Sequence, residues 1–282
     1  VTFIGLRCYF LHLPLIFVME RTLDKEDIWR IGKFLLWFAI PETILLVAQF
    51  YFPQTNWVNY SIGGEITQGF SGAEGHARAS GTFSFTVGIA GFYPLVVAAL
   101  LGFLLTRRKL PLYLIFAAAV STAMAIPISI NRTNALTCAG VLLAGSTAVI
   151  ALPNTPRHVV RIVLFLGITT LIASWLPHFD EGIDAFNSRW VSATGTNLGG
   201  FQSNIVMRFF DDLFPSPDLI FNAPVLGYGV GSGTPMAQAY LTGVREFNLS
   251  ESEWPRVILE MGPVLGLTFI LLRVALCVRL VR

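Results

Sequence analysis

The sequence predicts an all-α membrane protein, a polytopic bundle of about seven transmembrane helices, each built from roughly 20 mostly apolar residues. Of its 282 residues, 54% are hydrophobic, and the mean hydropathy is +0.65. Only 13% are charged, about half of the fraction usual in soluble domains. A polar stretch over 177–256 follows the first six apolar runs, and long insertions of this kind are usually functional. We expect it to be a large extracytoplasmic loop carrying short amphipathic helices, one of them near 201–213.

Each apolar run is a candidate for one spanning helix. The runs cover residues 2–18, 34–52, 83–105, 111–130, 135–153, 159–176 and 257–278. This predicts three regions, with spanning helices over 1–176, the large loop over 177–256 and the last spanning helix over 257–282. Inside the second run, a carboxylate at Glu42 would be costly in lipid, so we expect it to face the bundle interior. The first residue, Val1, and the apolar run near the end predict a fragment of a protein with further helices.

The distribution of Lys and Arg predicts the orientation. Links 19–33, 106–109 and 154–161 are rich in basic residues, whereas the links between them carry one arginine each, Arg78 and Arg132. Basic links stay on the cytoplasmic side of a membrane. We therefore expect Arg78, Arg132 and the large loop to lie outside the cytoplasm.

Arg78 and Arg132 stand at the outer mouths of two predicted helices. A guanidinium group presents a planar fork of donors that matches phosphate oxygens and stays charged. The two residues together could hold a lipid-linked diphosphate. Snorkelling of long basic side chains, or a simple role in topology, is the alternative.

The large loop adds further candidates for substrate binding. Arg189 and Arg208 are cations within it, and its glycine run, 227–233, includes Gly229 and Gly231. The run lies outside any soluble βαβ unit, so we exclude a dinucleotide fingerprint. Glycine allows the backbone to approach a sugar or phosphate closely, although it equally suits a turn with positive φ.

Three residues before the last helix complete the candidate site. Glu251 could act as general base on an acceptor hydroxyl. Glu253 and Arg256 could bind substrate, although Glu253 is also favourable at a helix N-terminus and Arg256 could pair with Glu260 at i,i+4. The only metal candidate, the pair Asp211 and Asp212, has no third ligand near it in the sequence, so we expect a solvated helix end and no metal.

Together these motifs resemble the O-antigen ligase and polymerase superfamily of bacterial membrane glycosyltransferases. Arg78-Ala-Ser-Gly-Thr-Phe83 resembles its first arginine segment, and Ser129-Ile-Asn-Arg132 resembles the Ser-x-x-Arg start of its C-terminal domain. Arg208, then 224–231 and 260–266, resemble its closing signature. The resemblance covers roughly 75–275. Ligases carry His-Asn about nine residues before the Glu-x-Gly element, where this chain has Glu251, which favours a polysaccharide polymerase or a divergent exopolysaccharide enzyme.

The resemblance implies a function. The protein would lie in the bacterial inner membrane as a multi-pass bundle with a periplasmic loop. It would transfer a glycan, with inversion and without metal, cofactor or nucleic acid, from an undecaprenyl-diphosphate-linked donor to an acceptor glycan or lipid. Arg78 and Arg132, assisted by Arg208, would neutralise the leaving diphosphate, and Glu251 would deprotonate the acceptor.

Three other classes remain open. A transporter or flippase of lipid-linked glycans would carry charges deep in its helices and related broken helices. A metal-dependent glycosyltransferase of the mannosyltransferase type would place an acidic motif in an early outer loop, where this chain has only the isolated Glu65 and Glu74. A structural membrane subunit would have no active site.

Overall fold

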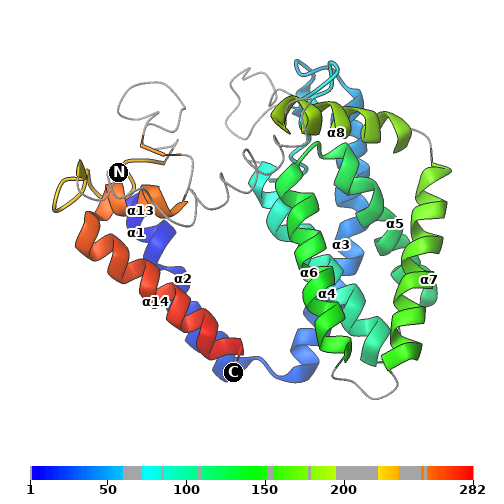
Figure 1. Cartoon of the computed structure of the whole chain (residues 1–282), viewed down its shortest axis with the longest axis horizontal. Coiled ribbons are helices and arrows are strands. Elements are labelled where there is room, and N and C mark those ends of the chain that lie inside the picture. The colour runs from blue at the N-terminus through cyan, green and yellow to red at the C-terminus, as the bar shows by residue number, and fades with distance from the viewer. Residues whose placement is uncertain are drawn as a thin grey trace. The chain divides into compact units, whose positions relative to one another are not determined.

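The computed structural model divides the chain into two compact units. One is Asp24–Ala193, here called the bundle; the other joins Val1–Leu23 to Thr194–Arg282 and is called the terminal unit. All regular structure in the described residues is helical (Figure 1). The described residues are 2–59, 72–83, 86–106, 110–150, 155–176, 179–194, 222–234, 249–250 and 253–281.

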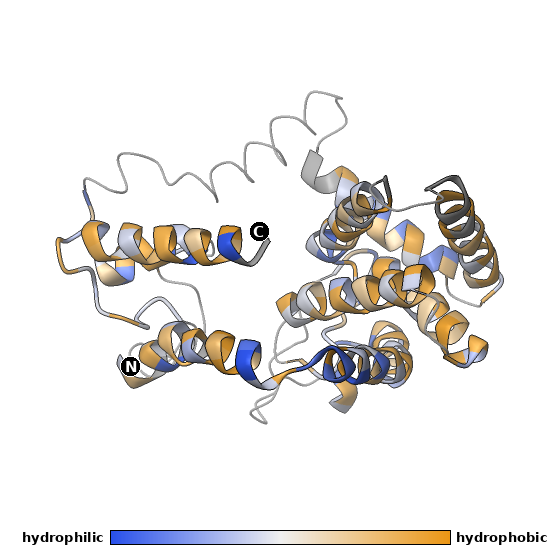
Figure 2. Cartoon of the chain, turned by 90° about the horizontal axis from the view of Figure 1, so that it is seen from below, coloured by the Kyte–Doolittle hydropathy of each residue, from blue (hydrophilic) through white to orange (hydrophobic). Residues whose placement is uncertain are grey.

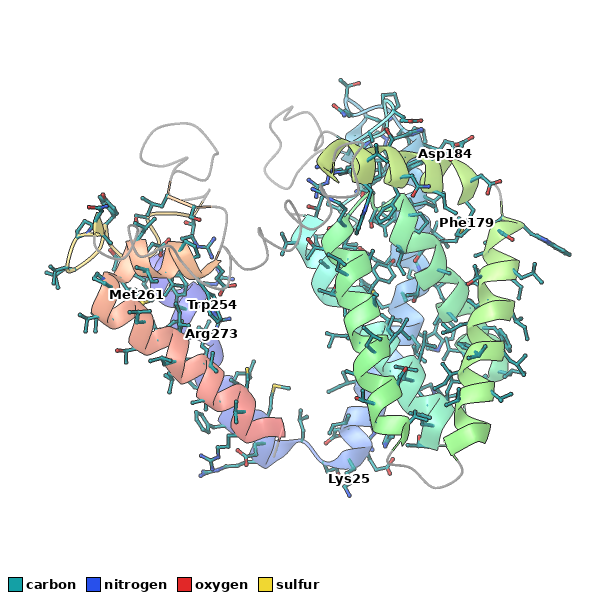
Figure 3. The ribbon with its side chains drawn as sticks, viewed as in Figure 1. Lys25, Phe179, Asp184, Trp254, Met261 and Arg273 are labelled. Atoms are coloured by element: carbon teal, nitrogen blue, oxygen red, sulfur yellow. The ribbon has the colours of Figure 1, made fainter. Side chains whose placement is uncertain are left out.

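The bundle is an antiparallel array of five long helices with a sixth across one end. Its elements are α3 (Lys25–Tyr51), the 3-10 helix η1 (Trp57–Asn59), α4 (Thr86–Thr106), α5 (Leu112–Ile128), α6 (Arg132–Ile150), α7 (Thr155–Ser174) and α8 (Phe179–Thr194). The last helix turns by 102° from α7 and crosses the end of the bundle (Figure 1). We call this the α8 end. Lys25 marks the opposite end, and Figure 3 labels Phe179 and Asp184 at the α8 end.

Helix α3 begins well before the expected residue 34 because a capping box starts it. Asp24 accepts a hydrogen bond of 2.8 Å from the N–H of Asp27, and the Asp27 carboxylate accepts one of 3.3 Å from the N–H of Asp24. These bonds satisfy donors that a helix start leaves open. The polar first turns therefore extend the apolar run into a 27-residue helix.

Polar bonds between helices fix the packing of the bundle core. Tyr93, fully buried on α4, forms a hydrogen bond of 2.7 Å with Thr43 of α3. Pro94 cannot donate to the carbonyl of Ala90 four residues earlier. Thr137 of α6 donates to that carbonyl at 3.2 Å, so a neighbouring helix satisfies the group that proline leaves open.

The expectation of about seven spanning helices is not supported. In the part of the chain that the structure describes, two helices are long and apolar enough to cross a membrane, α3 and α4, or three if the bent pair α7–α8 forms one span. Helix α5 has 17 residues, about 26 Å at 1.5 Å per residue, short of the roughly 30 Å hydrocarbon core. The first expected span is interrupted at Leu11 and the last at Gly262.

The large loop expected over 177–256 is not supported either. Helix α8 and the first turn of α13 lie within it. The amphipathic helix expected near 201–213 lies outside the described residues. A helix over 179–194 was missed because it begins with acidic residues and has no apolar run of spanning length.

Large hydrophobic side chains cover much of the outer surface of the bundle. Figure 2, which views the bundle from below, shows that hydrophobic residues predominate in its helices. Exposed examples are Ile44, Val87, Leu95, Leu143, Val163 and Leu171. Exposed apolar surface of this extent is unusual on a soluble monomer, and it agrees with helices that contact lipid.

In the described part of the terminal unit, four helices pack around a small apolar cluster. They are α1 (Thr2–Phe10), α2 (His12–Thr22), α13 (Glu253–Met261) and α14 (Pro263–Val281). Tyr9 meets Phe269 edge to face, with ring centroids 5.8 Å apart, and Val257 and Ile258 are fully buried beside them. Gly262 separates α13 from α14 with a φ of +82°, and a Cβ there would lie 2.0 Å from the Val225 carbonyl oxygen. Only glycine fits this break.

Candidate functional site

Three arginines from three different elements gather at the α8 end of the bundle. Arg78 lies in the segment that precedes α4, Arg132 is the first residue of α6, and Arg189 lies on α8. Both Arg132 and Arg189 are close enough to Arg78 for their charges to affect its pKa. Arg78, Arg132 and Arg189 are far apart in the sequence but lie together in the folded bundle, and we call these three residues the arginine cluster.

The surroundings of Arg78 disfavour the positive charge of its side chain. Burial lowers the pKa of its guanidinium to about 10, and the charges of Arg189 and Arg132 act in the same direction. Its Nε atom is buried and has no hydrogen-bond partner among the described residues. A pKa of about 10 still leaves Arg78 charged at neutral pH. The site therefore presents a cation with an open donor.

Arg189 is fixed by the backbone of the same region. Its Nη1 donates to the carbonyl of Gly72 at 3.3 Å. Among the described residues, neither Arg78 nor Arg189 has a carboxylate partner; the ion pairs there involve other arginines. Buried or half-buried charges are normally paired, so an anionic group of a ligand suits these two guanidinium groups.

The turn before α6 places Arg132. The side chain of Asn131 accepts hydrogen bonds from the N–H groups of Thr133 and Asn134, at 3.0 and 3.3 Å, which makes it the N-cap of α6. It also donates to the Thr86 carbonyl at 2.7 Å and so joins the starts of α4 and α6. Ile130 has a φ of +47°, rare for a β-branched residue. Such strain clusters at functional sites, and the N-terminus of α6 itself favours an anion.

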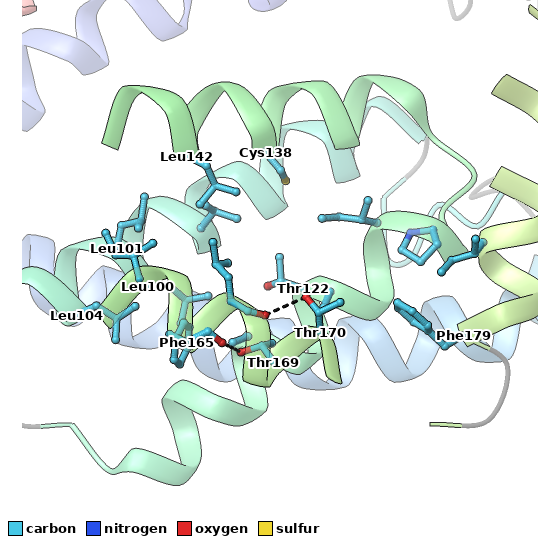
Figure 4. A pocket seen from close by; sticks show the side chains of 18 of the residues that line it. Leu100, Leu101, Leu104, Thr122, Cys138, Leu142, Phe165, Thr169, Thr170 and Phe179 are labelled. Carbon is cyan, nitrogen blue, oxygen red and sulfur yellow. Dashed lines mark hydrogen bonds between the residues drawn. The ribbon is translucent and has the colours of Figure 1, made fainter. Parts of the chain in front are cut away.

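An apolar cavity of about 380 Å³ lies inside the bundle, bounded by α4, α5, α6, α7 and α8 (Figure 4). Its walls include Leu100, Leu101, Leu142, Phe165 and Phe179. The polar groups of its threonines are already occupied, since Thr122 and Thr169 donate to carbonyls of their own helices. This mostly apolar cavity adjoins the helix that carries Arg189, because Phe186 of α8 lines the cavity three residues before Arg189.

The glycine run of the terminal unit binds a carboxylate of its own chain. Glu260 is fully buried, and its carboxylate accepts the N–H groups of Gly231 at 2.5 Å and Gly233 at 2.9 Å. The N–H of Gly229 donates to the backbone carbonyl of Glu260 at 3.0 Å. The amides of Gly229 and Gly231, expected to approach a sugar or phosphate, are thus engaged by the end of α13.

The other candidates of the terminal unit have local partners as well. Arg256 donates to the Tyr9 hydroxyl at 3.2 Å, and its Nε lies 3.9 Å from the Glu260 carboxylate, which is the i,i+4 pair considered above. Glu253, at the start of α13, is bonded to Arg273 of α14; Figure 3 shows both helices.

Several expected residues lie outside the described part of the chain: Glu251, Arg208 and the pair Asp211 and Asp212. Within the described residues, no group of three or more metal-ligating side chains comes together.

The buried Glu42 does face the bundle interior, with 1% of its surface exposed. Neither the cavity nor the role of the glycine run in holding Glu260 could be predicted from sequence, because each depends on residues far apart in the chain.

Comparison of the chain with protein-family models, with curated proteins and with solved structures gave no match.

Proposed function

We propose that this protein is a membrane glycosyltransferase that joins a glycan carried on a polyprenyl diphosphate to a sugar hydroxyl of an acceptor, as a polysaccharide polymerase or a related ligase. The arginine cluster carries this proposal. Three guanidinium groups that repel one another are held together at one end of a hydrophobic bundle. Such an arrangement costs free energy in the unliganded protein, and a multivalent anion offsets that cost.

A diphosphate suits the cluster better than a single carboxylate does. Guanidinium groups bind phosphoryl oxygens through paired hydrogen bonds, and two linked phosphates offer enough oxygens for three arginines. When the glycosidic bond to the diphosphate breaks, negative charge develops on the leaving group. Cations fixed in advance stabilise that charge without reorganisation.

The cavity supports a lipid-linked donor. Its apolar walls match a prenyl chain, and it lies under the helix that carries Arg189. The bundle therefore offers binding groups for both parts of such a ligand, with the arginine cluster for its anionic head and the cavity for its hydrocarbon tail. A free nucleotide sugar would leave the apolar half unused.

The reaction we propose is a single displacement. The acceptor hydroxyl oxygen attacks the anomeric carbon of the donor glycan, the bond from that carbon to the diphosphate oxygen breaks, and the configuration inverts. Glu251 takes the proton of the hydroxyl, and the polyprenyl diphosphate leaves as an anion held by the arginines. We place the α8 end outside the cytoplasm of a bacterial inner membrane, because the basic links 19–33, 106–109 and 154–161 adjoin the other end.

The transporter alternative receives less support. A transporter is expected to use charges deep within its helices. In the described interior of the bundle the buried charged residue is Glu42, and its Oε1 accepts the N–H of Thr82 at 2.9 Å. One oxygen of this single carboxylate therefore holds the backbone at the α8 end, whereas its Oε2 atom is buried without a hydrogen-bond partner among the described residues.

The test is glycan output in a host whose polymer depends on this protein. Arg78→Gln should reduce polymer at least about tenfold, since one lost transition-state charge contact is worth some 1.4 kcal/mol or more, and lipid-linked repeat units should accumulate on the outer face. The matched control is Arg30→Gln, which removes an exposed charge at the opposite end of the same bundle. Unchanged polymer in Arg78→Gln at normal protein level would contradict the proposal. Accumulation only on the cytoplasmic face would favour transport.

A further inference from the structure

Two buried polar side chains of α3 face the segment that carries Arg78. Glu42 and Gln49 are seven residues apart and therefore lie on one face of the helix, two turns from each other. Their exposed fractions are 1% and 5%. Polar groups inside a membrane-spanning helix are costly and usually functional, so their contacts need an explanation.

Both side chains bind the backbone that follows Arg78. The Gln49 Oε1 atom accepts the N–H groups of Ser80 at 3.0 Å and Gly81 at 2.7 Å, and its Nε2 donates to the Gly81 carbonyl at 3.1 Å. The Glu42 Oε1 atom accepts the next N–H, that of Thr82, at 2.9 Å. Three consecutive backbone amides are thus held by one face of α3, which we call the α3 clamp.

The fit between clamp and segment is close. Gly81 has a φ of +61°, and a Cβ there would lie 1.8 Å from the Glu42 Oε1 atom. On the other side of Arg78, the His76 ring stacks on Phe50 with centroids 3.9 Å apart, and its Nδ1 lies 3.1 Å from the Phe50 carbonyl oxygen. The segment is therefore fastened to α3 both before and after Arg78.

The side chains around Arg78 alternate as in an extended segment. Ala77 and Ala79 are buried, at 2% and 1% exposure, whereas Arg78 between them is only half-buried. Successive side chains of an extended backbone point to opposite sides. Holding the backbone at 80–82 therefore also fixes the side from which Arg78 reaches the cluster.

We propose that Glu42 and Gln49 are positioning residues: the α3 clamp holds Arg78 beside Arg132 and Arg189 against their mutual repulsion, so that the diphosphate site is formed before the ligand arrives. This inference rests on the proposed function. Without the clamp the segment would relax away from the other cations, and the ligand would have to bring the three groups together at the expense of its own affinity.

The experiment measures the affinity of purified protein in detergent micelles for farnesyl diphosphate, a short prenyl diphosphate. Gln49→Leu removes the three Gln49 bonds of the clamp, together with its bond to the Val58 carbonyl, at nearly constant volume, and it should weaken binding about tenfold. Glu42→Leu should do the same, whereas Glu42→Gln keeps an acceptor for the Thr82 N–H and should bind within about twofold of wild type. Thr43→Val is the matched control, because Thr43 is buried on the same helix but bonds Tyr93 and the Ser121 carbonyl instead of the segment.

The outcomes separate the two proposals. If Arg78→Gln weakens farnesyl diphosphate binding and both leucine variants bind normally per folded molecule, the clamp is wrong and the diphosphate site stands. If Arg78→Gln itself binds normally, the proposed site fails. A role in stability alone would make Thr43→Val and Gln49→Leu alike in affinity. If a leucine variant fails to fold, hydrogen exchange of the wild-type protein tests the clamp instead. The backbone amides of 80–82 should then be protected from exchange. Exchange at 80–82 as fast as at the exposed Glu74 and Gly75 would contradict the clamp.

Discussion

Arg78 shows how a single residue can be unfavourable for folding and favourable for binding. Its pKa is lowered by burial and by two neighbouring arginines, so carrying the charge costs the folded state free energy at every pH below about 10. Its Nε donor is buried and has no hydrogen-bond partner among the described residues.

We therefore expect Arg78→Gln to leave the free energy of unfolding unchanged or to raise it by about 1 kcal/mol, the size of one relieved repulsion near a surface. The same variant should lose most of the stabilisation that farnesyl diphosphate gives wild type, which is about 2.7 kcal/mol at a hundred times the dissociation constant. Denaturant titration in detergent, with and without the ligand, measures both quantities.

Arg30→Gln serves as the comparison, because Arg30 is exposed and pairs with Asp27 at 2.9 Å at the other end of the bundle. It should keep the full ligand-induced stabilisation. A large loss of stability in unliganded Arg78→Gln would show that the arginine is structural, contrary to our assignment.

At the scale of elements, the junction of α13 and α14 is held by the glycine run. Helix ends leave carbonyl groups open, and here the N–H groups of Tyr228 and Gly229 donate to the Leu259 and Glu260 carbonyls at 2.8 and 3.0 Å. The Glu260 side chain adds two further bonds to the same run. One residue thus joins a helix end, a loop and, through Arg256, the Tyr9 hydroxyl of α1.

Glu260→Ala should therefore lower the free energy of unfolding by about 3–5 kcal/mol, because it leaves Arg256 and two buried N–H groups without their partner. Glu253→Gln on the same helix should cost at most about 1 kcal/mol, since its pair with Arg273 is half exposed. Denaturant titration of the two variants measures the difference. Equal effects would show that Glu260 is no more important than a surface charge.

The positions of the helices could be predicted from sequence, whereas the positions at which helices are interrupted could not. Apolar runs located α3 to α7 within a few residues at most ends, because hydrophobic length is a local property. The breaks at Leu11 and Gly262 could not be seen, since an apolar run continues through each of them. The hydrogen bond from Gly231 to Glu260 joins residues that are 29 positions apart. A local sequence pattern cannot predict such a contact.

At the scale of the whole bundle, the arginine cluster follows from topology. Alternating helix direction predicts that Arg78 and Arg132 share one end, and the sequence alone sufficed to propose them as a pair. Arg189 joins them only because the chain turns by 102° after α7. The hydrophobic periodicity of the sequence does not predict that turn. Candidates such as Glu251 and Arg208 remain predictions from the sequence.

The same topology predicts which end of the bundle faces the cytoplasm. The starts of α3, α5 and α7 and the ends of α4 and α6 share the Lys25 end, and the three basic links adjoin these helix ends in the sequence. Lys and Arg concentrate on the cytoplasmic side of bacterial membrane proteins. The arginine cluster should then face outward, where a lipid-linked glycan meets its acceptor.

Labelling with a membrane-impermeant maleimide tests this orientation. The background is a variant without Cys8, Cys138 and Cys277, of which Cys277 is exposed. Asp184→Cys and Lys25→Cys then place single exposed reporters at the two ends of the bundle (Figure 3). In intact cells, Asp184→Cys should be labelled and Lys25→Cys should react only after permeabilisation, because α3 separates the two ends by more than a hydrocarbon core. The reverse pattern would place the arginines in the cytoplasm, where the proposed donor glycan is not exposed, and would exclude the proposed reaction.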